Sequence, residues 1–278
     1  MANQIQVWRP PQLEGVEAKR GERVTHSHPN HWHDELHLVL IEEGDGVLVH
    51  RGSALPTVAG SLFVVPPGEV HANYATAETG CTFRTVNLSV EEQKIWEEFR
   101  GRLERLPVTV THEKSVVQGF RALHQRLSRP ESRLAVEGEL LGFLDVLCHQ
   151  CGKASDRQEK AGSEPKAVRT VRDYLNAHLG RNVSLVELTA LTQLSPYYLT
   201  RVFKRAVGLP PHAYQNGMRV RRSRQLLRQG WKPAAVAATL GFADQAHFTR
   251  HFKRVVGLPP QLYQRQSKNV QDPSRELL

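Results

Sequence analysis

The sequence predicts an α+β protein in which a β-rich N-terminal domain precedes an all-α C-terminal domain. Short apolar runs punctuated by Gly and Pro, such as LHLVLI, GVLVH and LFVVP, fill the first hundred residues and are typical of strands. Apolar residues at helical spacing follow, as in LAVEGELLGFLDVLCHQC. Finally, LTRVFKRAVGLPPHAYQ (199–215) returns as FTRHFKRVVGLPPQLYQ (248–264), with twelve of seventeen positions identical. Two copies are too few for a solenoid and predict a pair of similar helical modules.

Composition divides the chain into two domains and a linker. Its 278 residues, 40% of them hydrophobic, suffice for about two domains with cores of their own. The stretch CGKASDRQEKAGSEP is polar and lacks periodicity, as is typical of a linker. We therefore expect a first domain at 1–150, a linker at 151–165 and a second domain at 166–278.

Charge is distributed unevenly between these domains. The chain carries a net charge of +9, yet residues 1–165 hold 18 Lys and Arg against 23 Asp and Glu. Residues 166–278 hold 19 against 5, a net charge of +14. Such a basic domain can displace counterions from a phosphate backbone, although an anionic membrane or solubility would favour the same composition.

Nothing in the sequence predicts a membrane partner or export. No apolar run approaches the roughly 18 residues that span a bilayer, and MANQIQVWRPPQ lacks the features of a signal peptide. Three cysteines, Cys81, Cys148 and Cys151, form no pattern typical of a disulfide framework. We expect a cytoplasmic protein.

Each copy of the repeat predicts a helix, a tight turn and a second helix. In the first copy, Ser184 and Glu187 form a capping-box pattern, and Ser195 precedes a second helix that ends at Gly208. In the second copy, Gly241 marks a turn that is one residue longer. Helix–turn–helix geometry lays its second helix in the major groove of DNA.

The doubled helix–turn–helix resembles the AraC/XylS family of bacterial transcription regulators. The resemblance covers residues 166–265 and rests on GLPPHAYQ, MRVRRSRQLL and GFADQAHFTRHFKR. It implies that the two recognition helices enter successive major grooves of one duplex. It also implies which side chains contact bases and which contact phosphates: Tyr197, Thr200, Arg201, Gln245, Ala246 and Arg250 for the bases, and Lys204 and Lys253 for the phosphates.

Two departures from the family pattern lie in this region. Gln193 stands where the family has Gly in its first turn, so that turn is expected to differ, and Ser223 replaces a small apolar residue. For single residues a plainer interpretation stays open: the basic positions could be solvated surface, and Arg201 and Arg250 could form ion pairs within their modules.

The N-terminal domain resembles cupin barrels in two segments. HWHDELHLVLIEEG begins at His31, and GSLFVVPPGEVH matches the motif G-x5-P-x-G-x2-H in full, ending at His71. In a metal-binding cupin the ligands are H-x-H, a Glu and a His. The corresponding residues here are His31, His33, His37 and His71, with His in place of Glu. Even spacing predicts that a regular strand would point the first three to one face.

Three interpretations of these histidines stay open. They could anchor a small organic effector in a pocket walled by Trp32 and Tyr74, bind a divalent transition metal, or be structural. The missing Glu favours the organic effector. A cupin enzyme fused to a DNA-binding domain is the alternative from another class, but no substrate-activating group accompanies the histidines.

These observations predict a ligand-responsive, sequence-specific transcriptional regulator rather than an enzyme, and we favour an activator. Its partners would be double-stranded operator DNA, RNA polymerase and a small-molecule effector. A stripe of Leu140, Leu144 and Leu147 in the helical segment before the linker predicts either a homodimer interface or packing onto its own barrel.

Overall fold

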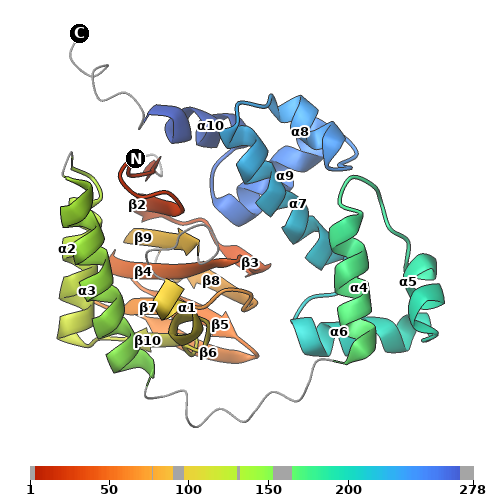
Figure 1. Cartoon of the computed structure of the whole chain (residues 1–278), viewed down its shortest axis with the longest axis horizontal. Helices are drawn as coiled ribbons and strands as arrows, with labels where there is room; N and C mark the ends of the chain where they lie inside the picture. The colour runs from red at the N-terminus through yellow and green to blue at the C-terminus, as the bar shows by residue number, and fades with distance from the viewer. Residues whose placement is uncertain (1–3, 77, 90–96, 130–131, 153–164, 270–278) are drawn as a thin grey trace. The chain divides into compact units, whose positions relative to one another are not determined.

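The structure is a computed structural model that describes residues 4–76, 78–89, 97–129, 132–152 and 165–269 (Figure 1). Its contacts divide the chain into two compact units, residues 1–158 with 265–278 and residues 159–264. Residues 153–164 of the expected linker lie outside the described part. The strand-rich first unit and the helical second unit confirm the predicted fold class.

In the described residues the first unit contains two antiparallel sheets. Both hold strands that are distant in sequence, as expected of a barrel rather than a simple meander. The six-stranded sheet has the order β1 (Gln4–Trp8), β2 (Val16–Val24), β9 (Cys81–Ser89), β4 (Glu35–Glu43), β7 (Leu62–Val65) and β10 (Thr109–Thr111). The four-stranded sheet has the order β3 (His28–His31), β8 (His71–Ala75), β5 (Gly46–His50) and β6 (Ser53–Thr57).

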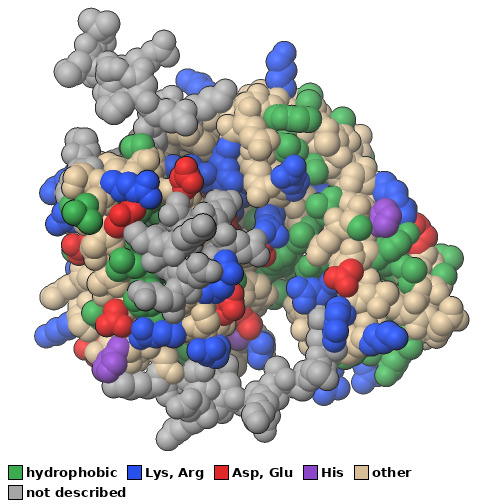
Figure 2. All heavy atoms as spheres, in the orientation of Figure 1, with side chains coloured by type: hydrophobic (Ala, Val, Ile, Leu, Met, Phe, Trp, Pro, Cys, Tyr) green, Lys and Arg blue, Asp and Glu red, His purple; other side chains and the backbone are tan. Residues whose placement is uncertain are grey.

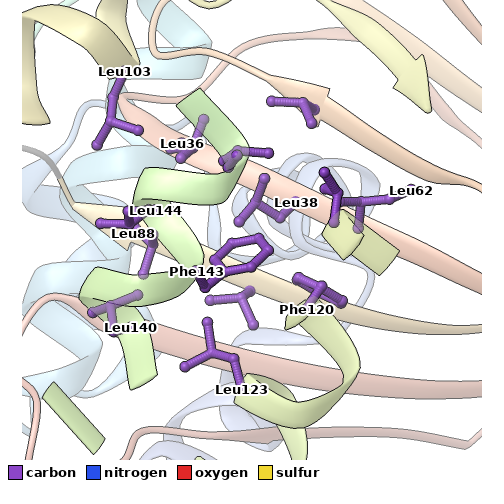
Figure 3. Close-up of a cluster of buried hydrophobic side chains, with 14 of the residues drawn as sticks. Leu36, Leu38, Leu62, Leu88, Leu103, Phe120, Leu123, Leu140, Phe143 and Leu144 are labelled. Carbon is purple, nitrogen blue, oxygen red and sulfur yellow. The ribbon is translucent and has the colours of Figure 1, made fainter. Parts of the chain in front are cut away.

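Strand β4 faces two different cores because its side chains alternate. Leu36, Leu38 and Leu40 belong to a large apolar cluster with the helices α2 (Lys114–Arg126) and α3 (Arg133–Cys151), which cover one face of the six-stranded sheet (Figures 1 and 3). Val39 and Ile41 belong to a second cluster, with members from both sheets. That cluster is therefore the barrel interior. A short helix, α1 (Glu97–Glu104), also contributes to the first cluster.

The leucine stripe lies on α3 and packs onto its own barrel. Leu140, Leu144 and Leu147 are each fully buried within one chain, and Figure 3 shows Leu140 and Leu144 among the side chains of the sheet. Each buried leucine contributes about 2 kcal/mol through removal of apolar surface from water. The interpretation of this stripe as a dimer interface is therefore wrong, because its apolar face is already covered.

A polar network joins α2 to the six-stranded sheet. The Glu42 carboxylate accepts hydrogen bonds from Arg84 Nε and Arg121 Nη2, each at 2.7 Å. His124 lies next to this network: its Nε2 donates to the Lys19 carbonyl at 2.9 Å, and its Nδ1 accepts from Arg84 at 3.3 Å. Burial lowers the pKa of His124 to about 4. The imidazole is thus held neutral.

The second unit is helical throughout its described part. Its helices are α4 (Lys166–Ala177), α5 (Leu185–Thr192), α6 (Pro196–Val207), α7 (Pro211–Arg228), α8 (Pro233–Thr239), α9 (Gln245–Val256) and α10 (Pro260–Asn269), the last of which extends past the boundary of the unit. None of the described helices is both long and apolar enough to cross a membrane.

We predict that His124 makes the first unit sensitive to acid. Its pKa lies below the unfolded value of 6.5, so the folded state binds fewer protons. Its stabilising contribution is complete above pH 6.5 and is lost as the pH falls towards 4, by up to about 3 kcal/mol. Urea unfolding of the wild type and of His124→Gln, followed by tryptophan fluorescence, should show a gap in unfolding free energy that narrows between pH 7 and pH 4.5. The barrel histidines titrate equally in both proteins and cancel. A constant gap would contradict the prediction.

Candidate DNA-reading helices and a buried histidine cluster

The caps predicted for the first module are present, and the second module has a cap that was not predicted. In the first, the Ser184 side chain and Glu187 form a complete capping box, and Ser195 caps α6 through the backbone N–H of Tyr198. In the second, Asp244 caps α9. These caps satisfy backbone donors that would otherwise have no partner, which fixes where each recognition helix begins.

The turn of the first module keeps its shape without glycine. Gln193 has a φ of 57° and occupies the same position as Gly241, whose φ is 68°. Its side chain donates to the Ala190 carbonyl at 2.8 Å, which offsets part of the roughly 1–2 kcal/mol cost of a left-handed residue with a Cβ. The departure noted in the sequence therefore changes the residue but not the left-handed conformation.

The recognition helices α6 and α9 bury apolar side chains and expose basic ones. Leu199 and Phe203 on α6 are fully buried, as are Phe248 and Phe252 on α9. Seven of the eight predicted DNA-contacting residues are exposed. The eighth, Thr200, is half-exposed, and its hydroxyl donates to the Pro196 carbonyl. The exposed ones are Tyr197, Arg201, Lys204, Gln245, Ala246, Arg250 and Lys253.

The basic side chains of these helices are available to a partner. Within the described residues, Arg201, Lys204, Arg250 and Lys253 form no ion pair, so the alternative that the two arginines pair within their modules is not supported. Figure 2 shows Lys and Arg side chains recurring over the face in view, with hydrophobic patches between them. None of these four residues is neutralised by a carboxylate in the part of the chain that the structure describes.

The rest of the repeat is architectural. Gln215 Nε2 donates to the carbonyls of His178 and Arg181, each at 3.1 Å. Gln264, at the equivalent position, donates to the carbonyls of Leu227 and Trp231, each at 2.9 Å. In both copies the glutamine thus binds carbonyls at the end of a preceding helix. The tyrosines Tyr214 and Tyr263 before them are buried against the phenylalanines of the recognition helices.

Arg219 on α7 links the two modules, a role that the sequence did not reveal. Its Nε donates to the Leu179 carbonyl at 2.9 Å, and its Nη2 donates to the Arg181 carbonyl at 2.8 Å. These carbonyls lie just before the first helix–turn–helix. The same guanidinium lies 5.7 Å from the ring centroid of Phe242, which lies in the turn of the second helix–turn–helix. The side chain is only 3% exposed, and burial lowers its pKa.

The backbones of the two modules also touch at a pair of glycines. A Cβ on Gly241 would lie 2.8 Å from the carbonyl oxygen of Gly180, and a Cβ on Gly180 would lie 2.9 Å from that of Thr239. Only glycine permits this approach, since real Cβ contacts are longer. Together with Arg219, the contact fixes the second module on the first.

Histidines gather inside the barrel, at the ends of several strands. One ligand nitrogen from each of His31, His33 and His71 lies within 4.8 Å of the others. His37 is adjacent, with its ring centroid 4.7 Å from that of His33. The cluster therefore includes all four predicted residues, three of them in a compact group.

The four imidazoles share one tautomer because each Nδ1 faces an oxygen that only accepts. His31 Nδ1 lies 2.9 Å from the Pro29 carbonyl, His33 Nδ1 lies 2.9 Å from the Glu35 carbonyl, and His71 Nδ1 lies 3.0 Å from the Glu69 carbonyl. His37 Nδ1 lies 2.5 Å from Asn87 Oδ1. Each Nδ1 must donate its proton, so in the neutral imidazole Nε2 keeps its lone pair.

Burial keeps His31, His37 and His71 neutral. It lowers the pKa of His31 to about 4 and the pKa of His37 and His71 well below the usual value, and neighbouring imidazoles lower the last two further. His71 is only 1% exposed, and its Nε2 has no hydrogen-bond partner among the described residues. The site presents lone pairs rather than charges.

The route by which the histidines meet differs from the prediction. They do not lie on one regular strand: His31 ends β3 in the four-stranded sheet, His33 follows in the connection, and His37 belongs to β4 in the six-stranded sheet. Trp32 is half-buried between the first two. Tyr74 alternates to the opposite face of β8 from His71 and is 40% exposed, so it does not line the cluster.

Both units match known families. Residues 15–144 match an AraC-like ligand binding domain, and residues 188–266 match a helix-turn-helix domain. The uncharacterized HTH-type transcriptional regulator YbfI of Bacillus subtilis is 28% identical over 236 residues, which cover 84% of this chain and 85% of that protein. The chain belongs to the AraC family of transcriptional regulators.

Other AraC-family proteins resemble this chain over most of its length. The transcriptional activator RhaS of Pectobacterium carotovorum is 25% identical over 232 residues, covering 79% of this chain and 81% of RhaS. The structure of unsaturated fatty acid bound ToxT from Vibrio cholerae has a TM-score of 0.60 and 13% identity, with 96% of each chain covered. That likeness concerns the fold.

We predict that Arg219 sets the spacing between the DNA segments that this AraC-family regulator contacts. Arg219→Met should lower the unfolding free energy of the helical unit by about 2–4 kcal/mol, because buried carbonyls lose a charged donor. It should also flatten the dependence of affinity on spacing, measured on a selected site with one base pair inserted or removed between the contacted segments. Arg222→Met removes an exposed arginine from the same helix and is the control. Equal spacing profiles for all three proteins would contradict the prediction.

Proposed function

We propose that the chain is a sequence-specific transcriptional regulator whose two recognition helices read an asymmetric site and whose barrel binds a controlling ligand. The observation that carries this proposal is the pair of capped helices α6 and α9, which expose arginines and lysines that form no ion pair with any described residue. A domain with a net charge of +14 supplies the attraction to phosphate. Base edges in the major groove supply the specificity.

We further propose that the regulator is an activator that contacts RNA polymerase from its operator, as its similarity to RhaS activators supports. A non-catalytic role for the barrel agrees with the relatives, which are named as regulators. The histidine end of the barrel is the ligand-binding region, because it combines buried polar groups with the apolar interior of Val39, Phe63 and their neighbours.

The electrostatic part of the proposal predicts strong salt dependence. A site obtained by selection from random DNA should bind the full chain with an affinity whose logarithm falls linearly with the logarithm of salt concentration, with a slope of about −0.9 for each phosphate neutralised. Fluorescence anisotropy at several potassium chloride concentrations measures this slope. A slope close to zero would sink the idea that the basic unit grips a DNA backbone.

Mutations should distinguish residues that contact bases from residues that contact phosphates. Arg250→Ala should cost about 1–3 kcal/mol on the selected site and relax preference at one or two base pairs. Lys253→Ala should weaken selected and random DNA alike and reduce the salt slope by about 1. Arg133→Ala removes the same charge from α3 in the other unit and should leave both properties unchanged. Indistinguishable losses for Arg250→Ala and Lys253→Ala on both kinds of DNA would refute the assignment.

A further inference from the structure

The imidazole lone pairs of the barrel cluster lie close together, and their number and spacing indicate which class of ligand the cluster binds. Its three closest imidazoles place one nitrogen each within 4.8 Å of the others, and the Nδ1 contacts assign the lone pairs to Nε2. A hydroxyl of an organic effector offers one hydrogen and can satisfy only one of these acceptors. A cation that accepts several electron pairs can satisfy all three at once.

The protein supports the imidazoles as metal sites usually do. Ligating histidines normally donate their second ring N–H to a carbonyl or carboxylate, which fixes ring orientation and raises basicity. Here backbone carbonyls perform this task for His31, His33 and His71. The Glu69 residue that holds His71 is itself fixed, because its carboxylate accepts from His50 at 2.7 Å and Arg51 at 3.0 Å.

A buried acceptor without a partner also disfavours the ligand-free state. His71 Nε2 has no hydrogen-bond partner in the described part of the chain, and leaving such a group unsatisfied costs about 1–3 kcal/mol. Because zinc–nitrogen bonds are about 2.0–2.1 Å long, the three nitrogens must come closer together to bind one ion. His33 is half-buried and lies in a connection between strands rather than within a strand.

We propose that the regulatory ligand of the barrel is a divalent transition metal ion bound by Nε2 of His31, His33 and His71. This inference rests on the proposed function and names the ligand of the same site. An all-imidazole set suits Zn²⁺, Ni²⁺, Cu²⁺ or Co²⁺, whereas Mg²⁺, Ca²⁺ and Mn²⁺ prefer oxygen. His37, held by Asn87, lies beside the ion and is not one of its three primary ligands.

Cobalt provides a direct probe of the ligand set. The purified full chain, stripped with chelator, should bind one Co²⁺ per chain with absorption bands typical of nitrogen ligation, and Zn²⁺ should displace it. His33→Ala and His31→Ala should each weaken binding at least about tenfold, and His37→Ala should weaken it less. His112→Ala removes an exposed histidine of the same unit and should bind as the wild type does. Circular dichroism confirms that each variant is folded.

Several outcomes would overturn the proposal. Absence of stoichiometric Co²⁺, Zn²⁺, Ni²⁺ and Cu²⁺ binding would do so, as would binding that survives in folded His33→Ala and His31→Ala. An organic molecule released from the purified wild type, with no metal detected by elemental analysis, would restore the organic-effector interpretation.

Operator binding separates this proposal from the function on which it rests. Zn²⁺ at fixed ionic strength should change the wild-type affinity for the selected site by about fivefold or more, and His33→Ala should keep its basal affinity but lose the response. Specific DNA binding without any metal response overturns the metal proposal and leaves the regulator intact. Metal binding without specific DNA binding overturns the proposed function instead.

Discussion

The buried guanidinium of Arg219 is the interaction on which the two-module architecture depends. One side chain binds carbonyls before the first helix–turn–helix and lies against Phe242 in the second. A buried charge is tolerated only where acceptors surround it, so the loop at Leu179–Asn182 must keep its shape for the helix α7 to pack. The contact between Gly180 and Gly241 leaves no room for a Cβ, and this close backbone contact further restricts movement of one module relative to the other. On the proposed function, two modules held in this way would present a single rigid surface to DNA.

This architecture explains what the repeat preserves and what it varies. Residues that hold each module together recur: the buried phenylalanines, the tyrosines against them and the glutamines that bind helix-end carbonyls. Lys204 and Lys253, the proposed phosphate contacts, recur as well, because any sequence of DNA presents the same phosphates. The first turns of the recognition helices differ, with Tyr197 in one and Ala246 at the same position in the other. A difference between the first turns of the two recognition helices suits an asymmetric site.

The features that could be predicted from the sequence are those decided within one or two helical turns. The capping box at Ser184 and the glycine stop at Gly208 depend on neighbours a few residues away, and the structure confirms both. The bridging role of Arg219 depends on contacts some 40 residues distant, which no local pattern contains. The leucine stripe of α3 was ambiguous for a related reason: amphipathicity shows that a face is covered but not by what.

The histidine cluster was found through motif resemblance, while the strand argument for it was wrong. Alternation along a single strand would have placed His31, His33 and His37 on one face, yet a break between β3 and β4 sends them to two different sheets. Their convergence is a property of barrel closure, which brings the ends of distant strands together. The expectation that Tyr74 walls the same pocket was also wrong. Side chains alternate along β8, so Tyr74 points to the opposite face of the strand from His71.

The energetics of the cluster suit a switch. The cluster costs free energy in the absence of a ligand, because His71 Nε2 is buried without a donor among the described residues, and a ligand that fills the site recovers that cost. At a concentration one hundred times its dissociation constant, a ligand stabilises the form that binds it by about 2.7 kcal/mol. Coupling energies of about 1–3 kcal/mol are typical of allosteric proteins. The free energy available at the histidines is therefore large enough to change occupancy of an operator, provided that the DNA-binding and ligand-binding forms of the chain differ in how tightly they hold these rings.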